Sequence, residues 1–190
     1  SKKDLNNFGK FKCILYGEIY TKYKNYNLIP NIFSKTDFDK NDSIISKGNE
    51  ILIPSSTTTT GIDLSNCKTL NNEDIILGGD IIILRPKKKI NREFYSYFLS
   101  TVSKPQFEMD ARGVTIYHIY PKQIREMFIP DLPENEKNQI VSFLNTKISL
   151  IDTLIDKTQK KIKLLKEKRL KFIEDITLNP GTKRIKLKYL

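Results

Sequence analysis

The chain has 190 residues, enough for one domain with a single hydrophobic core or for a smaller domain with a long appendage. It carries 33 Lys and Arg against 22 Asp and Glu, a net charge of +11 that favours an acidic partner such as nucleic acid. No window approaches about 18 uncharged apolar residues and the N-terminus has no hydrophobic signal core, so we expect a cytoplasmic protein with no membrane contact.

The cysteine pattern also excludes several classes of protein. Cys13 and Cys67 are lone residues and form no CxxC pair. This spacing argues against a zinc knuckle, a thioredoxin-type redox site and a disulfide framework. We therefore expect both to be buried thiols in a reducing compartment.

The first part of the chain predicts an α+β fold. Short β-branched runs predict strands, and Gly78-Gly79 predicts a turn between the last two of them. Aromatic residues at helical spacing predict a helix over residues 91–101, and residues 120–126 predict a shorter one. The expected strands are Phe11 to Tyr16, Ile51 to Pro54, Asp74 to Leu77, Asp80 to Leu84 and, just before Pro130, Met127 to Ile129.

A change of residue composition near residue 130 predicts a domain boundary. Residues 132–178 contain no Gly and only one Pro, Pro133, whereas most turn-forming residues come earlier. The sequence therefore divides into a globular domain over 1–130, a long helix over 131–178 and a tail over 179–190. The basic excess is spread over both parts, with a net charge of +5 before residue 131 and +6 after it.

The long helix carries the clearest pattern in the sequence. Ten positions follow one another by alternating steps of four and three, and eight of them are apolar. A 3.5-residue period over more than four heptads indicates a coiled-coil seam that needs a partner helix, because a face packed on a globular core would be broader. The predicted helix-pairing residues are Leu144, Ile148, Ile151, Ile155, Thr158, Ile162, Leu165, Arg169, Phe172 and Ile176.

Two polar residues and a run of cations modify this seam. Thr158 and Arg169 are either a polar rim or residues that fix the register of the pairing. Seven Lys and Arg residues fall within residues 160–171 against the single acidic Glu167. Such a run is typical of a solvated coiled-coil flank, and it also suits phosphate or an acidic protein surface.

No catalytic constellation is present in the sequence. His118 is the only imidazole, and the chain lacks GxSxG, GxxxxGK[ST], GxGxxG and Asn-Pro-Pro-Tyr motifs. Asp131, Glu134 and Glu136 allow a metal-dependent nuclease as an alternative. Their place at the start of a helix favours complementation of the helix dipole instead.

Three polar segments and one basic turn suit DNA binding. Hydroxyls and backbone amides position phosphates, whereas Arg, Asn and His recognise base edges. Each segment alone is also compatible with an ordinary polar surface turn. The candidate DNA-binding residues are Lys22, Tyr23 and Lys24; Ser55, Ser56, Thr57 and Thr58; Lys87 and Lys88; and Arg112, Gly113, Thr115, Tyr117 and His118.

The order of these features resembles one half of the DNA-specificity subunit of type I restriction-modification enzymes. The family pattern of Ile-Pro, Pro, Glu-Gln, Ile and Phe-Leu-Asp ahead of a heptad helix is matched by Ile129-Pro130, Pro133, Glu136-Lys137, Ile140 and Phe143-Leu144-Asn145. Lys137 replaces the usual Gln, and Asn145 replaces the common Asp. The helix then ends with Leu165-Lys166-Glu167-Lys168-Arg169-Leu170-Lys171-Phe172-Ile173, which is similar to Leu-Lys-x-x-Arg-x-x-Leu-Ile.

The resemblance implies a small mixed target recognition domain followed by a spacer helix. It implies a non-catalytic subunit that recognises half of a split DNA target and docks a methyltransferase subunit and a restriction subunit. The cofactors S-adenosylmethionine, ATP and magnesium would then belong to those partners, with none bound by this chain. Lys183 to Leu190 resembles the opening strand of a second recognition domain.

A complete subunit of that family has two recognition domains and two long helices packed antiparallel, whereas this chain has one of each. The exposed seam therefore predicts self-association through the long helix. The rival interpretation is a self-contained dimeric transcription regulator, in which the coiled coil only dimerises the protein.

Overall fold

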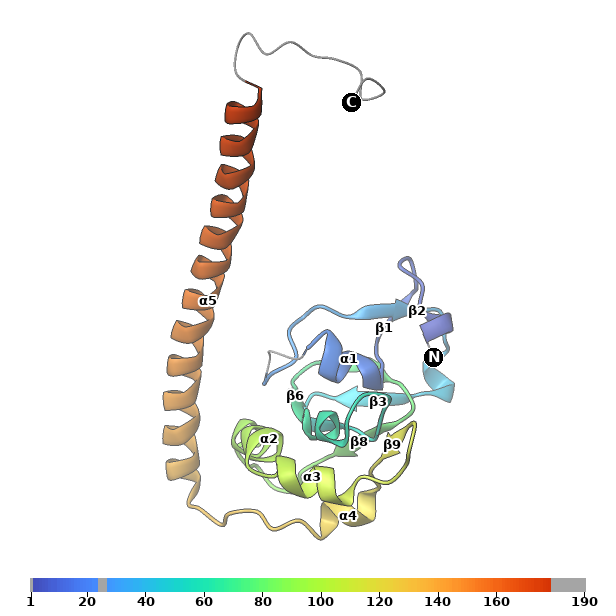
Figure 1. Cartoon of the computed structure of the whole chain (residues 1–190). Coiled ribbons are helices and arrows are strands. Elements are labelled where there is room, and N and C mark those ends of the chain that lie inside the picture. The colour runs from blue at the N-terminus through green and yellow to red at the C-terminus, as the bar shows by residue number, and fades with distance from the viewer. Residues whose placement is uncertain (1, 24–26, 179–190) are drawn as a thin grey trace. The chain divides into compact units, whose positions relative to one another are not determined.

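The computed structural model describes residues 2–23 and 27–178, and it divides into two compact units between Val141 and Ser142 (Figure 1). The first unit is an α+β globule, and the second is the continuation of one long helix. The fold class predicted from the sequence is confirmed. The predicted boundary at residue 130 falls in the linker ahead of this helix, whose first two turns belong to the globule.

The larger sheet has the strand order β2-β1-β7-β3. Its strands are β1 (Phe11–Ile14), β2 (Ser34–Thr36), β3 (Ile44–Lys47) and β7 (Glu73–Leu77), and only the β1–β7 pair is parallel. The strand expected over residues 11–16 is too long, because β1 ends at Ile14 and helix α1 (Tyr16–Thr21) already begins at Tyr16. Leu15 is the N-cap, and its backbone N–H donates to the Glu18 carboxylate over 2.9 Å.

A second sheet has the order β6-β4-β8, with β4 (Glu50–Pro54) between β6 (Lys68–Leu70) and β8 (Ile81–Leu84). Gly78-Gly79 lies between β7 and β8 as predicted, but these two strands belong to different sheets and do not pair with each other. The chain changes sheet there through Asp80, which adopts a positive φ of 59°. A two-stranded sheet pairs β5 (Ser56–Thr57) with β9 (Tyr117–His118).

Short helices cover the second sheet and close the globule. Asn91 caps α2 (Arg92–Thr101) by accepting a hydrogen bond from the Phe94 backbone N–H, as its sequence position favours. The expected strand over residues 127–129 is wrong, since this segment forms no strand. The remaining helices are α3 (Lys104–Asp110), α4 (Pro121–Arg125) and the 3-10 turns η1 (Lys2–Asp4), η2 (Lys40–Asp42) and η3 (Gly61–Ser65).

Strand β4 supplies side chains to two separate hydrophobic cores. Ile51 and Ile53 pack in the core beneath α2, α3 and α4, whereas Leu52 packs in the core around β1, β7 and α1. Successive side chains of a strand point to opposite faces, so one strand can link both cores. The predicted buried thiols are confirmed, with Cys67 fully buried and Cys13 2% exposed. Burial raises the pKa of the Cys13 thiol to about 11, and it also raises that of Cys67.

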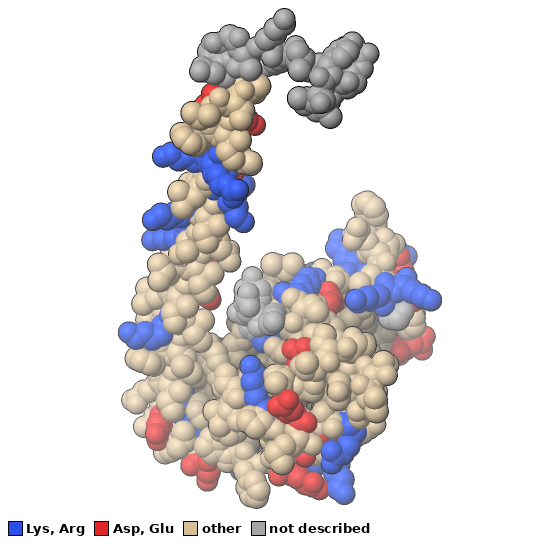
Figure 2. Space-filling model, viewed as in Figure 1, with Lys and Arg blue, Asp and Glu red and all other residues tan. Residues whose placement is uncertain are grey.

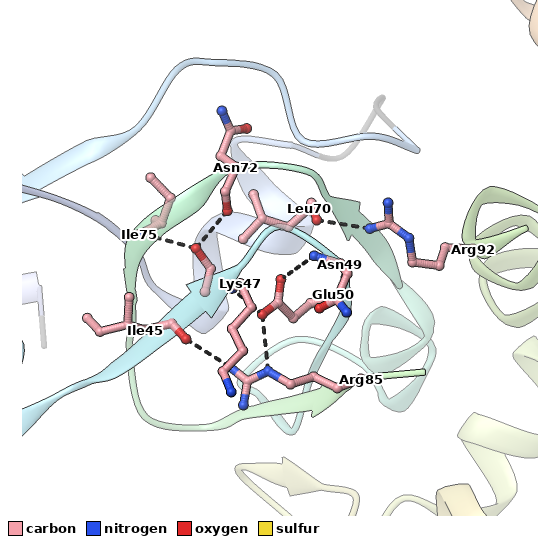
Figure 3. A network of polar contacts seen from close by, with 10 residues as sticks. Ile45, Lys47, Asn49, Glu50, Leu70, Asn72, Ile75, Arg85 and Arg92 are labelled. Carbon is pink, nitrogen blue, oxygen red and sulfur yellow. Dashed lines mark hydrogen bonds and ion pairs between the residues drawn. The ribbon is translucent and has the colours of Figure 1, made fainter. Parts of the chain in front are cut away.

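A polar network joins the two larger sheets (Figure 3). The Glu50 side chain is fully buried on β4 and accepts hydrogen bonds from the Lys47 and Asn49 backbone N–H groups and from Arg85 Nε, the last over 3.1 Å. Arg85 also donates to the Ile45 carbonyl of β3 over 2.8 Å. A carboxylate this deep is tolerated because every partner is a donor.

The long helix α5 runs over Glu134–Thr177, close to the predicted bounds, and at 1.5 Å per residue is about 65 Å long. Its first turns are anchored in the globule by Lys137, which is 4% exposed. Lys137 Nζ lies 2.7 Å from the Glu134 carboxylate and 5.0 Å from the centre of the Tyr95 ring. Glu134 in turn accepts from the Asn91 backbone N–H. The lysine that replaces the usual Gln of the family pattern is therefore an anchor for the helix.

Beyond Val141 the helix has little of its apolar surface covered within the described chain. Ile151, Ile155, Leu165, Phe172 and Ile176 are each between 46% and 67% exposed. Across the described residues, we find no helix of the length and apolarity that a membrane crossing requires. The predicted tail over residues 179–190 and its opening-strand resemblance lie outside the described residues.

Candidate nucleic-acid interface

The pairing of β5 with β9 brings together two segments that are far apart in sequence. Ser56 lies opposite His118, and Thr57 lies opposite Tyr117. The hydroxyl-rich residues that follow β5 therefore lie beside the loop that precedes β9. Gly61 and Ala111 pack where these segments meet, and a Cβ on Gly61 would lie only 2.9 Å from the Ala111 Cβ.

The loop over residues 112–118 is closed by two backbone hydrogen bonds. The Arg112 N–H donates to the His118 carbonyl over 2.9 Å, and the His118 N–H donates to the Arg112 carbonyl over 2.8 Å. Gly113 adopts a φ of +134°, and a Cβ there would lie 1.8 Å from the Ile116 carbonyl oxygen. Only glycine fits this position, so the backbone of the tip is tightly constrained.

Six exposed side chains of these two segments form a surface that we call the recognition edge; the exposed Thr59 is left out because its hydroxyl bonds Thr57 and Asp63. It presents three hydroxyl groups, one guanidinium group and two apolar side chains. Its members are Thr58, Thr60, Arg112, Val114, Thr115 and Ile116. Helix α4 is tied to the base of this edge, since the Gln123 side chain donates to the Asp110 carbonyl, and it adds the exposed cations Lys122 and Arg125.

Three of the candidate DNA-binding residues are corrected by their burial. Tyr23 is 1% exposed and lies in a hydrophobic core, where its hydroxyl donates to the Ile32 carbonyl over 2.6 Å. Ser56 and Thr57 are 2% and 0% exposed. These three side chains support the fold and cannot contact a duplex directly. Burial raises the pKa of the Tyr23 hydroxyl.

The buried hydroxyls stabilise the loops from below. Thr57 Oγ1 lies 2.7 Å from Thr59 Oγ1, and Thr59 in turn bonds Asp63 at the start of η3. Ser56 Oγ lies 3.2 Å from His118 Nδ1, and the His118 ring stacks on Tyr120. A serine this deeply buried is out of reach of a substrate, so the Ser56–His118 bond ties β5 to β9.

The other candidate cations lie elsewhere. The antiparallel register of β4 and β8 puts Leu84 beside Ile51, so Lys87 and Lys88 follow the end of β8 that lies farthest from β5. Lys22 is exposed but is engaged by Glu18, at 3.1 Å, and by Ser34. Ser55 is half-buried, and Lys24 lies outside the described residues. The structure therefore unites two of the three predicted segments and separates the basic turn from them.

Glu134, the first residue of α5, has a structural role. Lys137 and the Asn91 backbone N–H stabilise the ionised form of Glu134, and together they lower the pKa of this carboxyl. The same ion pair and a bond to Tyr95 raise the pKa of Lys137. Among the described residues no group of three His, Cys, Asp or Glu side chains is placed to hold a metal ion.

The charge distribution differs between the two units. Figure 2 shows acidic and basic side chains interspersed over the visible face of the globule, whereas basic side chains dominate the C-terminal half of α5. The fold defines a class of protein: an α+β globule followed by one long helix whose apolar side chains are largely exposed.

The comparison with protein families identifies which module this is. Residues 1–164 match the model of the type I restriction modification DNA specificity domain. The chain belongs to this family. A comparison with curated proteins gives no significant match.

Solved structures show the same fold. The S subunit of the type I restriction-modification system from M. genitalium aligns over 95% of this chain with a TM-score of 0.52 and 17% identity. A chain from a study of type I R-M complex assembly and conformational transition aligns over 87%, with a TM-score of 0.60 and 18% identity. The HsdS subunit from Thermoanaerobacter tengcongensis aligns over 84%, with a TM-score of 0.53 and 18% identity.

This chain spans less than half of each of these proteins. The aligned portions are 42%, 38% and 35% of their lengths, respectively. The shared portion holds one globule and its long helix.

Proposed function

We propose that this chain is a DNA-recognition subunit of a type I restriction-modification complex and that it performs no chemistry itself. The observation that carries this function is the β5–β9 pairing, which gathers exposed hydroxyls and Arg112 on one edge. Hydroxyls position a duplex through its phosphates, whereas Arg can bind guanine O6 and N7 with two hydrogen bonds. One globule of this size recognises one half of a split target. The function requires access to cellular DNA and thus a cytoplasmic location.

The partners follow from the same proposal. A methyltransferase subunit would bring S-adenosylmethionine, and a restriction subunit would use ATP and magnesium. The run Lys157 to Lys171 on α5 has eight basic residues and only Glu167 as an acidic one. This charge suits docking of an acidic surface on a partner subunit.

The seam of α5 supports antiparallel self-association. The ten seam positions are symmetric about residue 160, so an antiparallel pair centred there puts Leu144 opposite Ile176 of the second copy and Ile155 opposite Leu165 of the second copy. Thr158 then faces Ile162, and Arg169 faces Ile151. A parallel pair would instead put Arg169 against itself, which is electrostatically unfavourable.

The residues that flank the seam favour the same orientation. In the antiparallel alignment Asp152 lies near Lys166 of the second copy, and Lys147 lies near Asp175 of the second copy. Each contact occurs twice by symmetry, and the like-charged contact of Lys161 with itself occurs once. Two globules held apart by this spacer would recognise two half-sites with an unread centre.

The decisive experiment measures sequence-specific DNA binding. A target is selected from a random duplex pool by the chain as purified, with any methyltransferase that copurifies. Arg112→Ala is expected to weaken binding to the selected target by about 1–3 kcal/mol and to relax one base position. Arg112→Lys keeps the positive charge but cannot form two hydrogen bonds to one guanine. Compared with Arg112→Ala, it is therefore expected to recover affinity for random duplex but not the preference for the selected target.

Lys88→Ala is the matched control. It removes a cation from the far end of β8 and is expected to affect all sequences alike. Selection of no preferred sequence would refute the recognition function. Equal effects of Arg112→Ala on target and random duplex would remove Arg112 from base recognition.

A further inference from the structure

The tip of the 112–118 loop presents an apolar side chain to solvent. Val114 is 91% exposed, and Ile116, two residues on, is 45% exposed. The other exposed side chains of the recognition edge are hydroxyls and the Arg112 guanidinium. An apolar side chain among these polar groups contributes no phosphate contact, so we consider which other part of a duplex it could contact.

The position of Val114 is fixed by its loop. The two backbone bonds between Arg112 and His118 close the loop, and the Gly113 backbone packs so closely against Ile116 that a Cβ would lie 1.8 Å from the Ile116 carbonyl oxygen. Arg112 also donates to the Met109 carbonyl over 3.1 Å, which ties the loop to the end of α3. A side chain held in this way loses little conformational entropy on binding.

The chemistry of base edges limits what Val114 can recognise. In the major groove the edges present hydrogen-bond donors and acceptors, and thymine adds its apolar 5-methyl group. A valine isopropyl group forms no hydrogen bond, so the thymine methyl is its complementary partner. Arg112 and Thr115, which are also exposed in this loop, are polar side chains that could contact neighbouring phosphates or bases.

We propose that Val114 contacts the 5-methyl group of one thymine in the major groove and makes that position of the target thymine-specific. This inference rests on the proposed DNA-recognition function. It adds a specificity-determining residue that acts by apolar contact.

The test replaces each thymine of the selected target, one at a time, by deoxyuridine. This change removes only the methyl group and keeps the base pair. For the wild-type chain one replacement is expected to weaken binding about fourfold, the effect of one methyl group withdrawn from an apolar contact. Val114→Ala is expected to bind the thymine duplex about fourfold more weakly and to make no distinction at that position, as a double-mutant cycle requires.

Val102→Ala is the control, because Val102 is also an exposed valine, at 66%, but lies between α2 and α3. It is expected to keep the full distinction between thymine and deoxyuridine. The inference is overturned if no thymine is sensitive, if Val114→Ala retains the sensitivity, or if Val114→Ala weakens both duplexes equally. Arg112→Ala separates the two proposals, since its effect on target binding persists when only the thymine contact is wrong.

Discussion

The globule and the long helix use apolar residues in opposite ways. The globule buries its apolar side chains in two cores that share β4. The helix after Val141 carries an equally regular apolar row and leaves most of it at the surface. A 3.5-residue apolar row is typical of a helix that pairs with another helix. The globule thus buries its apolar side chains within itself, whereas for the long helix we propose a partner helix.

The largest expected effect comes from charging the apolar row. Ile155→Asp with Ile162→Asp is expected to convert a dimer into a monomer, because carboxylates inside the seam cannot be hydrated in the pair. Sedimentation velocity measures the oligomeric state, and circular dichroism checks that the globule stays folded. Leu150→Asp with Leu164→Asp is the matched control, since both leucines are exposed on α5 but lie off the row.

Persistence of the dimer in the seam variant would contradict the antiparallel pair. A wild-type chain that stays monomeric at micromolar concentration would do so as well.

The next largest effect is expected from breaking the buried ion pair of Glu50 with Arg85 in the globule. Glu50→Gln removes the charge that neutralises Arg85 in the network between the sheets. Loss of one partner of a buried ion pair costs about 3–5 kcal/mol, and the one-third exposure of Arg85 favours the lower end. We expect the Tm to fall by roughly 6–12 °C in differential scanning calorimetry.

Glu73→Gln serves as the control for Glu50, because this carboxylate lies exposed on β7. The two variants should differ clearly in Tm. Similar melting curves would mean that the network contributes little to stability.

The smallest effect lies where the two regions join. The pKa of Glu134 is lowered in the folded protein, so its contribution to stability is present above the usual carboxyl range and is lost as pH falls through the folded pKa. The melting temperatures of wild type and Glu134→Gln should therefore differ at pH 7 and converge in acid below about pH 4. Glu136→Gln, which removes a carboxylate from the same exposed turn, is the matched control. A difference that stays constant with pH would contradict the ion pair with Lys137.

The bounds of the two longest helices followed from local pattern, whereas the pairing of the strands did not. Helix α5 and helix α2 lie close to their predicted ranges, since helical periodicity and capping involve residues a few positions apart. The strands β7 and β8 lie close to their predicted ranges with Gly78-Gly79 between them, but the local pattern did not show that each pairs in a different sheet. Nothing local distinguishes a hairpin turn from a passage between sheets.

The candidate site shows the same limit. Residues with hydroxyl groups or positive charges indicated which segments suit DNA binding, but the side chains of Tyr23, Ser56 and Thr57 are buried. Exposure depends on the side of a strand or helix that meets the core, and in Thr57 and Thr58 it changes within one residue. The apolar tip residue Val114 carried no polar signal that sequence reasoning could use.

The sequence by itself determined the long helix, its unpaired row and the class of fold, because these depend on contacts within a few turns of one chain. The tertiary structure alone decided that β5 meets β9, that Lys87 and Lys88 lie away from that edge, and that Lys137 anchors the helix. These contacts join residues far apart in sequence, and their free energy arises only when the whole core forms.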